Sequence, residues 1–204
     1  KLLSSRTYQS RFASAPSTPA PSAWYGYTAP NIMIAIAFEG CACRAAFHAG
    51  VCAALAEGNI ALDLASGASS GSLCAAAVAA GRGAQLPAMW RALAGRKVVS
   101  LRRLLWNRSP FNMSYLVRSA LTEHLGTLDL RSCPTEALIV ATRLSDLSRI
   151  VYSSRHEPDL IDPLMGSCFF PLLYGRPVRV RTDWLLDGGA VDNLPVEILA
   201  ERGA

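Results

Sequence analysis

A serine between two glycines, where an apolar strand gives way to an alanine-rich helix, constrains this chain more than any other feature. The segment Gly67-Ala68-Ser69-Ser70-Gly71 follows an apolar run over 62–65 and precedes a helix-forming stretch over 73–80. Glycines permit the tight, strained turn that lifts a serine hydroxyl above a sheet. We therefore predict a nucleophile elbow with Ser69 as the nucleophile; the alternative is an ordinary Gly/Ser turn. The helix that begins at Ser70 would direct free N–H groups and its positive dipole end toward an anion beside Ser69.

A second candidate group lies near the C-terminus. Trp184-Leu185-Leu186 has the character of a strand, and Asp187-Gly188-Gly189 follows it directly. An aspartate at a strand end, with glycine backbone beside it, is well placed to act as a base. The alternative is that Asp187 only caps a turn, as the residue pair Asp-Gly often does.

A third group follows the apolar run over 32–38, which predicts a buried strand. Small residues after such a strand allow a tight loop whose N–H groups converge on a ligand. The loop begins at Glu39 and Gly40, and a helix is expected over 45–57. This arrangement is typical of an anion-binding cradle.

In this order and at this spacing, the three groups resemble the patatin-like phospholipase family. That family has a glycine-rich oxyanion loop with a basic residue, a G-x-S-x-G elbow and a late D-G-G or D-G-A. The resemblance covers residues 32–204 and implies a serine lipid acyl hydrolase that needs no cofactor and no metal. Gly40 and Arg44 match the family's loop, whereas Cys41, Ala42 and Ala45 stand where it has glycine.

The activating base has to be found without histidine. No histidine follows Asp187, so the Ser, Asp, His order of α/β-hydrolases is not completed in this chain. We therefore expect a Ser69–Asp187 dyad, in which burial raises the pKa of Asp187 toward the working pH. His48, within the helix after the loop, is expected to be structural rather than catalytic.

The remaining site residues are assigned to two groups. The N–H groups expected to stabilise the oxyanion belong to Gly40, Cys41, Ala42 and Ser70. Residues expected to support the site are Arg44, Gly67, Gly71 and Gly188. For Arg44 we favour hydrogen bonds that brace the loop carbonyls over the alternative of steering an anionic head group.

Six cysteines raise the question of metal or disulfide. None of them shows the paired C-x-x-C spacing of a zinc site, so no metal site is predicted. Small buried hydrophobic residues are the better interpretation, and their even number mildly favours a reducing compartment.

Residues 1–30 differ from the rest, with a Ser/Ala/Pro-rich composition, three basic residues and no acidic residue. We interpret them as a flexible tail or linker, and residues 31–204 as the acyl hydrolase domain. Strands alternating with helices predict an α/β fold: a layered, mostly parallel sheet with helices on both faces. Strands are expected over 32–38, 62–66, 137–143, 149–154 and 178–186, and helices over 45–57, 70–81, 86–106, 113–125, 158–165 and from Pro195.

A basic segment over 82–118 contains no Asp or Glu and mixes arginines with apolar residues, including Trp90 and Trp106. It predicts peripheral contact with an anionic membrane surface. The alternatives are a solvated helix face and a nucleic-acid patch, and no nucleic-acid recognition motif is present. With no run of 18 apolar residues and no Sec signal, we expect a cytoplasmic or peripheral membrane location rather than a transmembrane or Sec-secreted one.

Together these features predict a phospholipase A-type lipid acyl hydrolase or related esterase that acts on phospholipid or other lipid esters. One alternative is a catalytically silent lipid-binding or interaction domain, favoured by Cys41, Ala42 and Ala45. The other is an esterase for small soluble esters.

Overall fold

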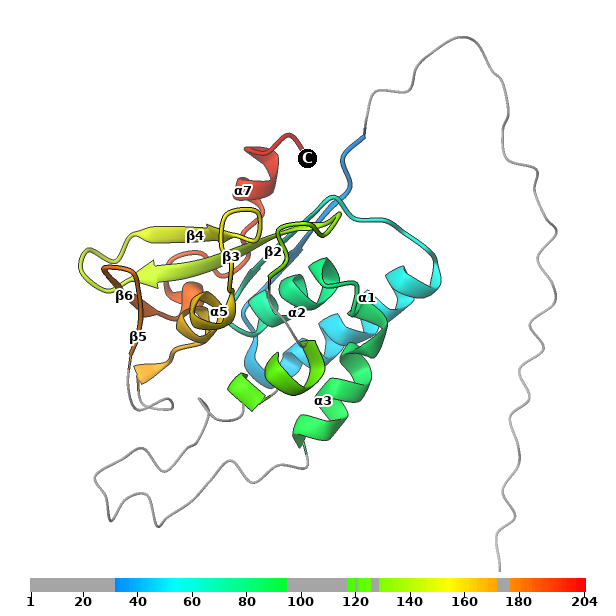
Figure 1. Ribbon diagram of the computed structural model, residues 1–204, viewed down its shortest axis with the longest axis horizontal. Coiled ribbons are helices and arrows are strands. Elements are labelled where there is room, and N and C mark those ends of the chain that lie inside the picture. Colours follow the sequence, from blue (N-terminus) through cyan, green and yellow to red (C-terminus); the bar gives the residue numbers. More distant parts are fainter. Residues whose placement is uncertain (1–31, 95–116, 120, 126–128, 172–176) are drawn as a thin grey trace, which may run out of the picture. The chain divides into compact units, whose positions relative to one another are not determined.

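The computed structural model contains a six-stranded sheet with helices around it (Figure 1). The predicted tail over 1–30 and most of the basic segment lie outside the residues that the structure describes. Those described residues are 32–94, 117–119, 121–125, 129–171 and 177–204. Among them, no helix has both the length and the apolar character needed to cross a membrane.

Strands and helices follow one another along the chain largely as predicted. The strands are β1 (Ala35–Phe38), β2 (Leu64–Ala68), β3 (Glu136–Arg143), β4 (Arg149–Ser153), β5 (Val178–Val180) and β6 (Asp183–Leu186). The α-helices are α1 (Ala46–Glu57), α2 (Ser70–Ala79), α3 (Leu86–Ala94), α5 (Ile161–Ser167) and α7 (Glu197–Ala200). Short helical turns are η1 (Ala42–Ala45), η2 (Gly83–Gln85), η4 (Leu121–Leu125) and η5 (Gly188–Ala190).

The sheet is parallel in its first half and antiparallel in its second. β1 pairs with β2 and β2 with β3 in parallel, whereas β3 pairs with β4 and β6, and β5 with β6, in antiparallel register. The single strand expected over 178–186 is in fact the hairpin β5–β6. Its turn contains Arg181 at φ 54°, a left-handed conformation that no strand pattern reveals.

β2 and β6 occupy the same edge of β3. β4 pairs with β3 from Leu138 to Thr142, a stretch that overlaps the residues paired with β2 and with β6. Because each edge of β3 can pair with one strand at a given residue, β4 lies on the edge opposite to β2 and β6. β2 runs parallel to β3 and ends opposite Val140, while β6 runs antiparallel and ends opposite Thr142. The carboxyl ends of β2 and β6 therefore meet head to head beside Ala141.

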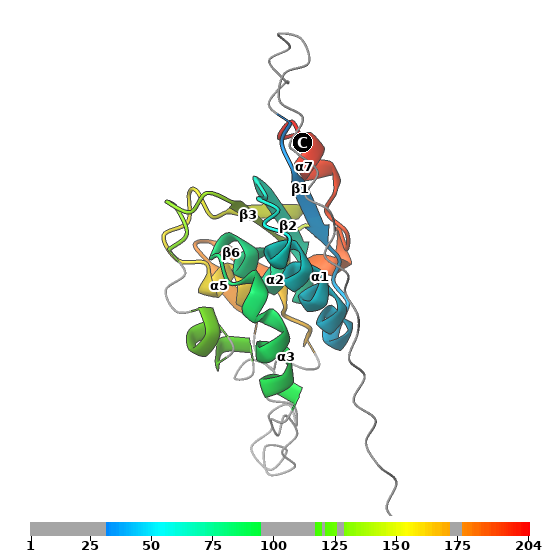
Figure 2. The same ribbon diagram turned by 90° about the vertical axis from the view of Figure 1, so that its right-hand side faces the viewer.

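Helices cover both faces of the sheet, as predicted (Figure 1). On one face, Leu64 of β2 and Leu138 of β3 pack with Ile198 and Leu199 of α7. Figure 2 shows α7 beside the edge strand β1. The strand residues that point the other way belong to the main core, which α1, α2, α3 and α5 complete. Successive side chains along each strand thus contribute alternately to two separate apolar layers.

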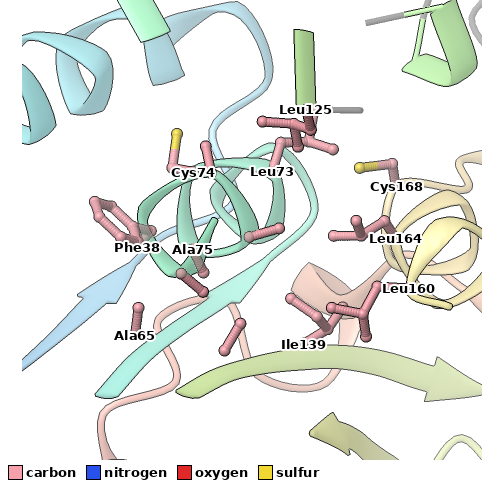
Figure 3. Close-up of a cluster of buried hydrophobic side chains, with 14 of the residues drawn as sticks. Phe38, Ala65, Leu73, Cys74, Ala75, Leu125, Ile139, Leu160, Leu164 and Cys168 are labelled. Carbon is pink, nitrogen blue, oxygen red and sulfur yellow. The ribbon is translucent and has the colours of Figure 1, made fainter. Parts of the chain in front are cut away.

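α2 is buried on nearly all sides because its side chains are small. Nine of its ten residues are buried, and alanines make up much of its sequence. A helix that is apolar all round has to lie inside the protein, and small side chains let its neighbours approach closely. In Figure 3, Leu73 of α2 lies close to Leu125, while Ile139 of β3 lies near Leu160 and Leu164 around α5.

The two glycines of the elbow allow backbones to touch. A Cβ at Gly71 would clash with the carbonyl oxygens of Phe38 and Glu39, and one at Gly67 would clash with the carbonyl of Gly71. Small residues here therefore bring the first turn of α2 against the end of β1. This contact places the loop after β1 next to the elbow.

We expect Gly71→Ala to lower the free energy of unfolding by about 3 kcal/mol, because the added methyl group meets backbone rather than a movable side chain. Urea denaturation measures this change. Gly50→Ala is the matched control: Gly50 is exposed in α1, an added Cβ there meets no atom within 4 Å, and the change should stabilise by up to about 1 kcal/mol. Equal stabilities for the two variants would contradict the close approach.

Candidate active site

Ser69 and Asp187 come directly after the two strands that meet head to head. The Ser69 hydroxyl donates a hydrogen bond to Oδ2 of Asp187 at 2.6 Å, across 118 positions of sequence. Both residues are partly buried. A hydroxyl and a carboxylate in this contact can pass a proton directly, without an intervening group.

The rest of Asp187 is held in place by its own backbone and by neighbours. Its other carboxylate oxygen accepts the Gly189 N–H at 2.8 Å, and its carbonyl accepts the Thr142 hydroxyl at 2.8 Å. Its N–H donates to the Phe169 carbonyl at 2.9 Å. Burial raises the pKa of Asp187, and the hydrogen bonds from Ser69 and Gly189 oppose that rise in part. Burial therefore makes the carboxylate a stronger base than an exposed aspartate.

Ser69 adopts a strained backbone conformation, with φ 50° and ψ −128°. Two other serines hold its peptide groups. Ser167 accepts the Ser69 N–H at 2.9 Å and donates its own hydroxyl to the Val140 carbonyl at 2.6 Å. The Ser72 hydroxyl donates to the Ser69 carbonyl at 2.5 Å. Such strain costs about 1–3 kcal/mol and persists only where the surroundings fix it, which these bonds do.

The roles of Ser72, Ser167 and Thr142 are not visible in the sequence pattern. Ser72 lies within the predicted helix, and Ser167 within a small-residue segment before Pro171. A serine among alanines or glycines looks the same in the sequence whether its hydroxyl makes a buried hydrogen bond to the backbone or makes no such bond. The same holds for Thr142, whose role depends on where β6 pairs.

The loop after β1 lies against the nucleophile. A Cβ added at Gly40 would be 3.0 Å from the Ser69 Cβ, so the predicted oxyanion loop and the elbow are neighbours. Two of the four N–H groups expected to bind the oxyanion form hydrogen bonds within the protein. The Gly40 N–H donates to the Asn193 carbonyl at 2.9 Å, and the Cys41 N–H donates to the Ser70 hydroxyl at 3.1 Å.

The other two expected donors are the N–H groups of Ala42 and Ser70. Each residue is the first of a helical element, so its N–H has no intrahelical acceptor. Of the three loop positions where the family has glycine, one adopts a conformation that favours glycine: Ala42 has φ 50°. Cys41, at φ −143°, and Ala45, at φ −60°, lie in regions open to any residue.

Asn193 links this loop to the turn after β6. Its carbonyl accepts the Gly40 N–H, and the neighbouring Asp192 forms an ion pair with Arg149 of β4 at 2.9 Å. The turn that carries Asp187 is thereby fixed to both the loop and the sheet. The sequence pattern alone predicted no role for Asp192 or Asn193.

Two predicted supporting residues behave differently from each other. Gly188 fits closely, since a Cβ there would clash with the Val140 carbonyl. The side chain of Arg44 is exposed and, within the described part of the chain, has no hydrogen bond to a loop carbonyl, so the expected bracing has no geometric support. His48 packs its ring against Phe38, 5.5 Å between centroids, and no hydrogen bond joins it to either member of the pair among the described residues.

An apolar cavity of about 340 Å³ opens beside Asp187. Its volume is in the range of small-ligand sites. The lining residues are Phe169, Phe170, Pro171, Leu186, Asp187, Gly189, Ala190 and Asn193.

The described part of the basic segment does not present its apolar side chains to solvent. Met89 and Leu93 of α3 are buried, and Trp90 is half-buried, while Arg82 and Arg91 are exposed. Residues 95–116 lie outside the described residues, so membrane contact through 82–118 stays a prediction.

Comparison with known proteins places the chain beside a family model, a curated relative and a solved structure. A family model described as "Patatin-like phospholipase" matches residues 36–200, which confirms the resemblance. The mouse (Mus musculus) protein named 1-acylglycerol-3-phosphate O-acyltransferase Pnpla3 is 35% identical over 88 residues, 42% of this chain and 21% of that relative. The crystal structure of VipD from Legionella pneumophila matches with a TM-score of 0.51 at 15% identity, covering 82% of this chain and 47% of that one. The last likeness concerns the fold alone.

We expect Asp187→Asn to stabilise the fold at neutral pH. Because burial raises the pKa of Asp187 above its unfolded value, the folded state holds a proton that the unfolded state has released, and stability falls as pH rises through that window. Asparagine removes this penalty, so the gain should be present at pH 7 and vanish below the ordinary aspartate pKa. Urea denaturation at several pH values measures the difference.

Asp192→Asn, in the same turn, is the control with the opposite sign. It removes the ion pair with Arg149 and should lower stability at neutral pH. If Asp187→Asn also lowered the free energy of unfolding at pH 7, the expectation that burying the Asp187 charge is unfavourable would be refuted.

Proposed function

The chain belongs to the patatin-like phospholipase family, and we propose that it hydrolyses lipid esters with Ser69 as nucleophile and Asp187 as base. The observation that carries the proposal is the hydrogen bond from the Ser69 hydroxyl to the Asp187 carboxylate at 2.6 Å. The family implies a lipid acyl hydrolase. The roles of the two residues and the identity of the ester are the proposal.

In the first half of the reaction, Ser69 Oγ attacks the ester carbonyl while Asp187 Oδ2 takes its proton. The carbonyl oxygen becomes an oxyanion, for which the predicted donors without an intrahelical acceptor are the N–H groups of Ala42 and Ser70. When the tetrahedral intermediate collapses, the carbon–oxygen bond to the leaving alcohol breaks. Asp187 returns the proton to that alcohol, and the acyl group stays on Ser69.

In the second half, the same carboxylate acts on water. Asp187 takes a proton from the water molecule as it attacks the acyl-enzyme carbonyl, and it protonates Ser69 Oγ when the acyl bond breaks. A carboxylate can serve both steps because burial raises the pKa of Asp187 while Gly189 holds its other oxygen. The base is thereby kept in one orientation through the cycle.

The apolar lining of the cavity beside Asp187 supports an acyl chain as the group that is bound. Phe169, Phe170 and Leu186 are among the apolar residues that line it. Burial of methylene groups against such a wall contributes about 0.8 kcal/mol per group. A preference for long-chain over short-chain esters would therefore separate a lipid substrate from the small soluble esters of the alternative.

Transfer of the acyl group to another lipid is a second candidate reaction. The mouse relative is named as an acyltransferase to 1-acylglycerol 3-phosphate, although this chain matches 21% of its length. The two reactions share the acyl-enzyme and differ in whether water or an alcohol attacks it. Supplying 1-acylglycerol 3-phosphate during hydrolysis and assaying for the diacyl product distinguishes them.

A catalytically silent domain is the alternative from another class. The engagement of the Gly40 and Cys41 N–H groups within the protein favours it, because these donors are among those expected to bind the oxyanion. The pair formed by Ser69 and Asp187 favours an enzyme instead. Reaction with a fluorophosphonate separates the two, since only an activated serine reacts quickly.

We expect Ser69→Ala to abolish both ester hydrolysis and fluorophosphonate labelling, with a loss of at least ~10³-fold in turnover. Mass spectrometry of the labelled chain should place the adduct on Ser69. Ser145→Ala, which changes an exposed serine between β3 and β4, should leave both readouts unchanged. Full turnover in Ser69→Ala would end the proposal.

We also expect Ser70→Ala to raise turnover. This change keeps the backbone N–H of residue 70 but removes the hydroxyl that accepts the Cys41 N–H, so that N–H becomes available to the oxyanion. Steady-state kinetics with a short-chain chromogenic ester measure the effect, which should appear in kcat rather than KM. A fall in kcat would mean that the Ser70 hydroxyl orders the loop instead of competing for its donor.

A further inference from the structure

Glu39, Cys41 and His48 bring three metal-ligating atoms together on the side of the loop after β1. One carboxylate oxygen, one thiol sulfur and one ring nitrogen all lie within 4.8 Å of one another. Cys41 Sγ and His48 Nδ1 are 3.9 Å apart. We propose that these three side chains form a binding site for a divalent transition-metal ion of the zinc class, a role that the hydrolytic mechanism does not use.

The donor set indicates the class of ion. Thiolate sulfur and imidazole nitrogen favour zinc and its neighbours over magnesium or calcium, which prefer oxygen. Three protein ligands leave one position of a tetrahedral ion for water or another small ligand.

The distances allow one ion to reach all three atoms. Zinc binds sulfur at about 2.3 Å and nitrogen at about 2.0–2.1 Å, so the two ligand atoms lie roughly 3.6 Å apart at a tetrahedral angle. The observed 3.9 Å between Cys41 Sγ and His48 Nδ1 requires only a somewhat wider angle. The limit of 4.8 Å for the set is roughly 1.2 Å longer than the separation of two ligand atoms on one tetrahedral ion. The side chain of Glu39, which is not buried, can close that gap by rotating.

Two of the three side chains are held in place by the surrounding structure. Cys41 is buried, and its thiol has to release a proton for a metal ion to bind. The ring of His48 is oriented by Phe38 and by Phe47, whose centroid is 6.3 Å away.

The order of the residues explains why cysteine spacing gave no sign of this site. Glu39 follows β1, Cys41 precedes the short turn η1, and His48 lies in the first turn of α1. The turn and the start of the helix fold the histidine back over the cysteine seven positions earlier. A zinc motif defined by paired cysteines does not describe such a set.

The test is direct metal binding by the purified full chain after treatment with a chelator. Zinc is titrated in competition with a chromophoric chelator, and Co²⁺ is followed by its absorption, because a thiolate ligand gives a charge-transfer band. We expect one zinc per chain and a cobalt–thiolate band. His48→Gln should weaken zinc binding at least ~10-fold, and Cys41→Ser should abolish the cobalt–thiolate band.

Cys43→Ser is the matched control, since Cys43 is an exposed cysteine of the same loop that is not part of the set. It should bind both metals as the parent chain does. No binding by the parent chain, unchanged affinity in His48→Gln, or loss of binding in Cys43→Ser would each overturn the proposal. Because these readouts do not depend on catalysis, they are independent of the outcome for Ser69→Ala. If Cys41→Ser does not fold, His48→Gln still decides, and circular dichroism checks the fold of each variant.

Discussion

The head-to-head meeting of β2 and β6 along one edge of β3 is the constraint on which the candidate site depends. β2 stops opposite Val140 and β6 stops opposite Thr142, so the residues that follow them turn toward each other. Backbone hydrogen bonds of the sheet fix both strand ends. Ser69 and Asp187 therefore meet because of strand direction and register, and their 2.6 Å contact needs no flexible loop to form it.

Burial and strain at this point serve the same chemistry. The elbow holds Ser69 at a positive φ, and the hydroxyl groups of Ser72 and Ser167 form hydrogen bonds with its carbonyl and its N–H. The same close packing partly buries Asp187, and this burial raises its pKa. A serine on a strained turn and a carboxylate with a raised pKa are the pair that we propose as nucleophile and base.

The loop after β1 is the part of the site with competing hydrogen bonds. Gly40 and Cys41 direct their N–H groups to acceptors within the protein, and Asn193 couples the loop to the turn that carries Asp187. Glu39, Cys41 and His48 lie on and beside the same loop, so a metal ion there would hold its two ends together. The N–H groups of Gly40 and Cys41, the turn that carries Asp187 and the proposed metal site are thus connected through a few residues.

Local pattern was enough to predict the order of strands and helices, the strand-turn-helix at Ser69 and the place of Asp187 at a strand end, because apolar periodicity and glycine placement act over a few residues. It failed for the hairpin β5–β6, which depends on a left-handed turn at Arg181. It also could not identify the hydrogen bonds that Ser72 and Ser167 form with Ser69, the acceptors of the loop N–H groups, or the set formed by Glu39, Cys41 and His48. These features arise only when distant segments pack, since a hydrogen bond or a shared ligand requires partners whose separation is set by the sheet and not by the chain.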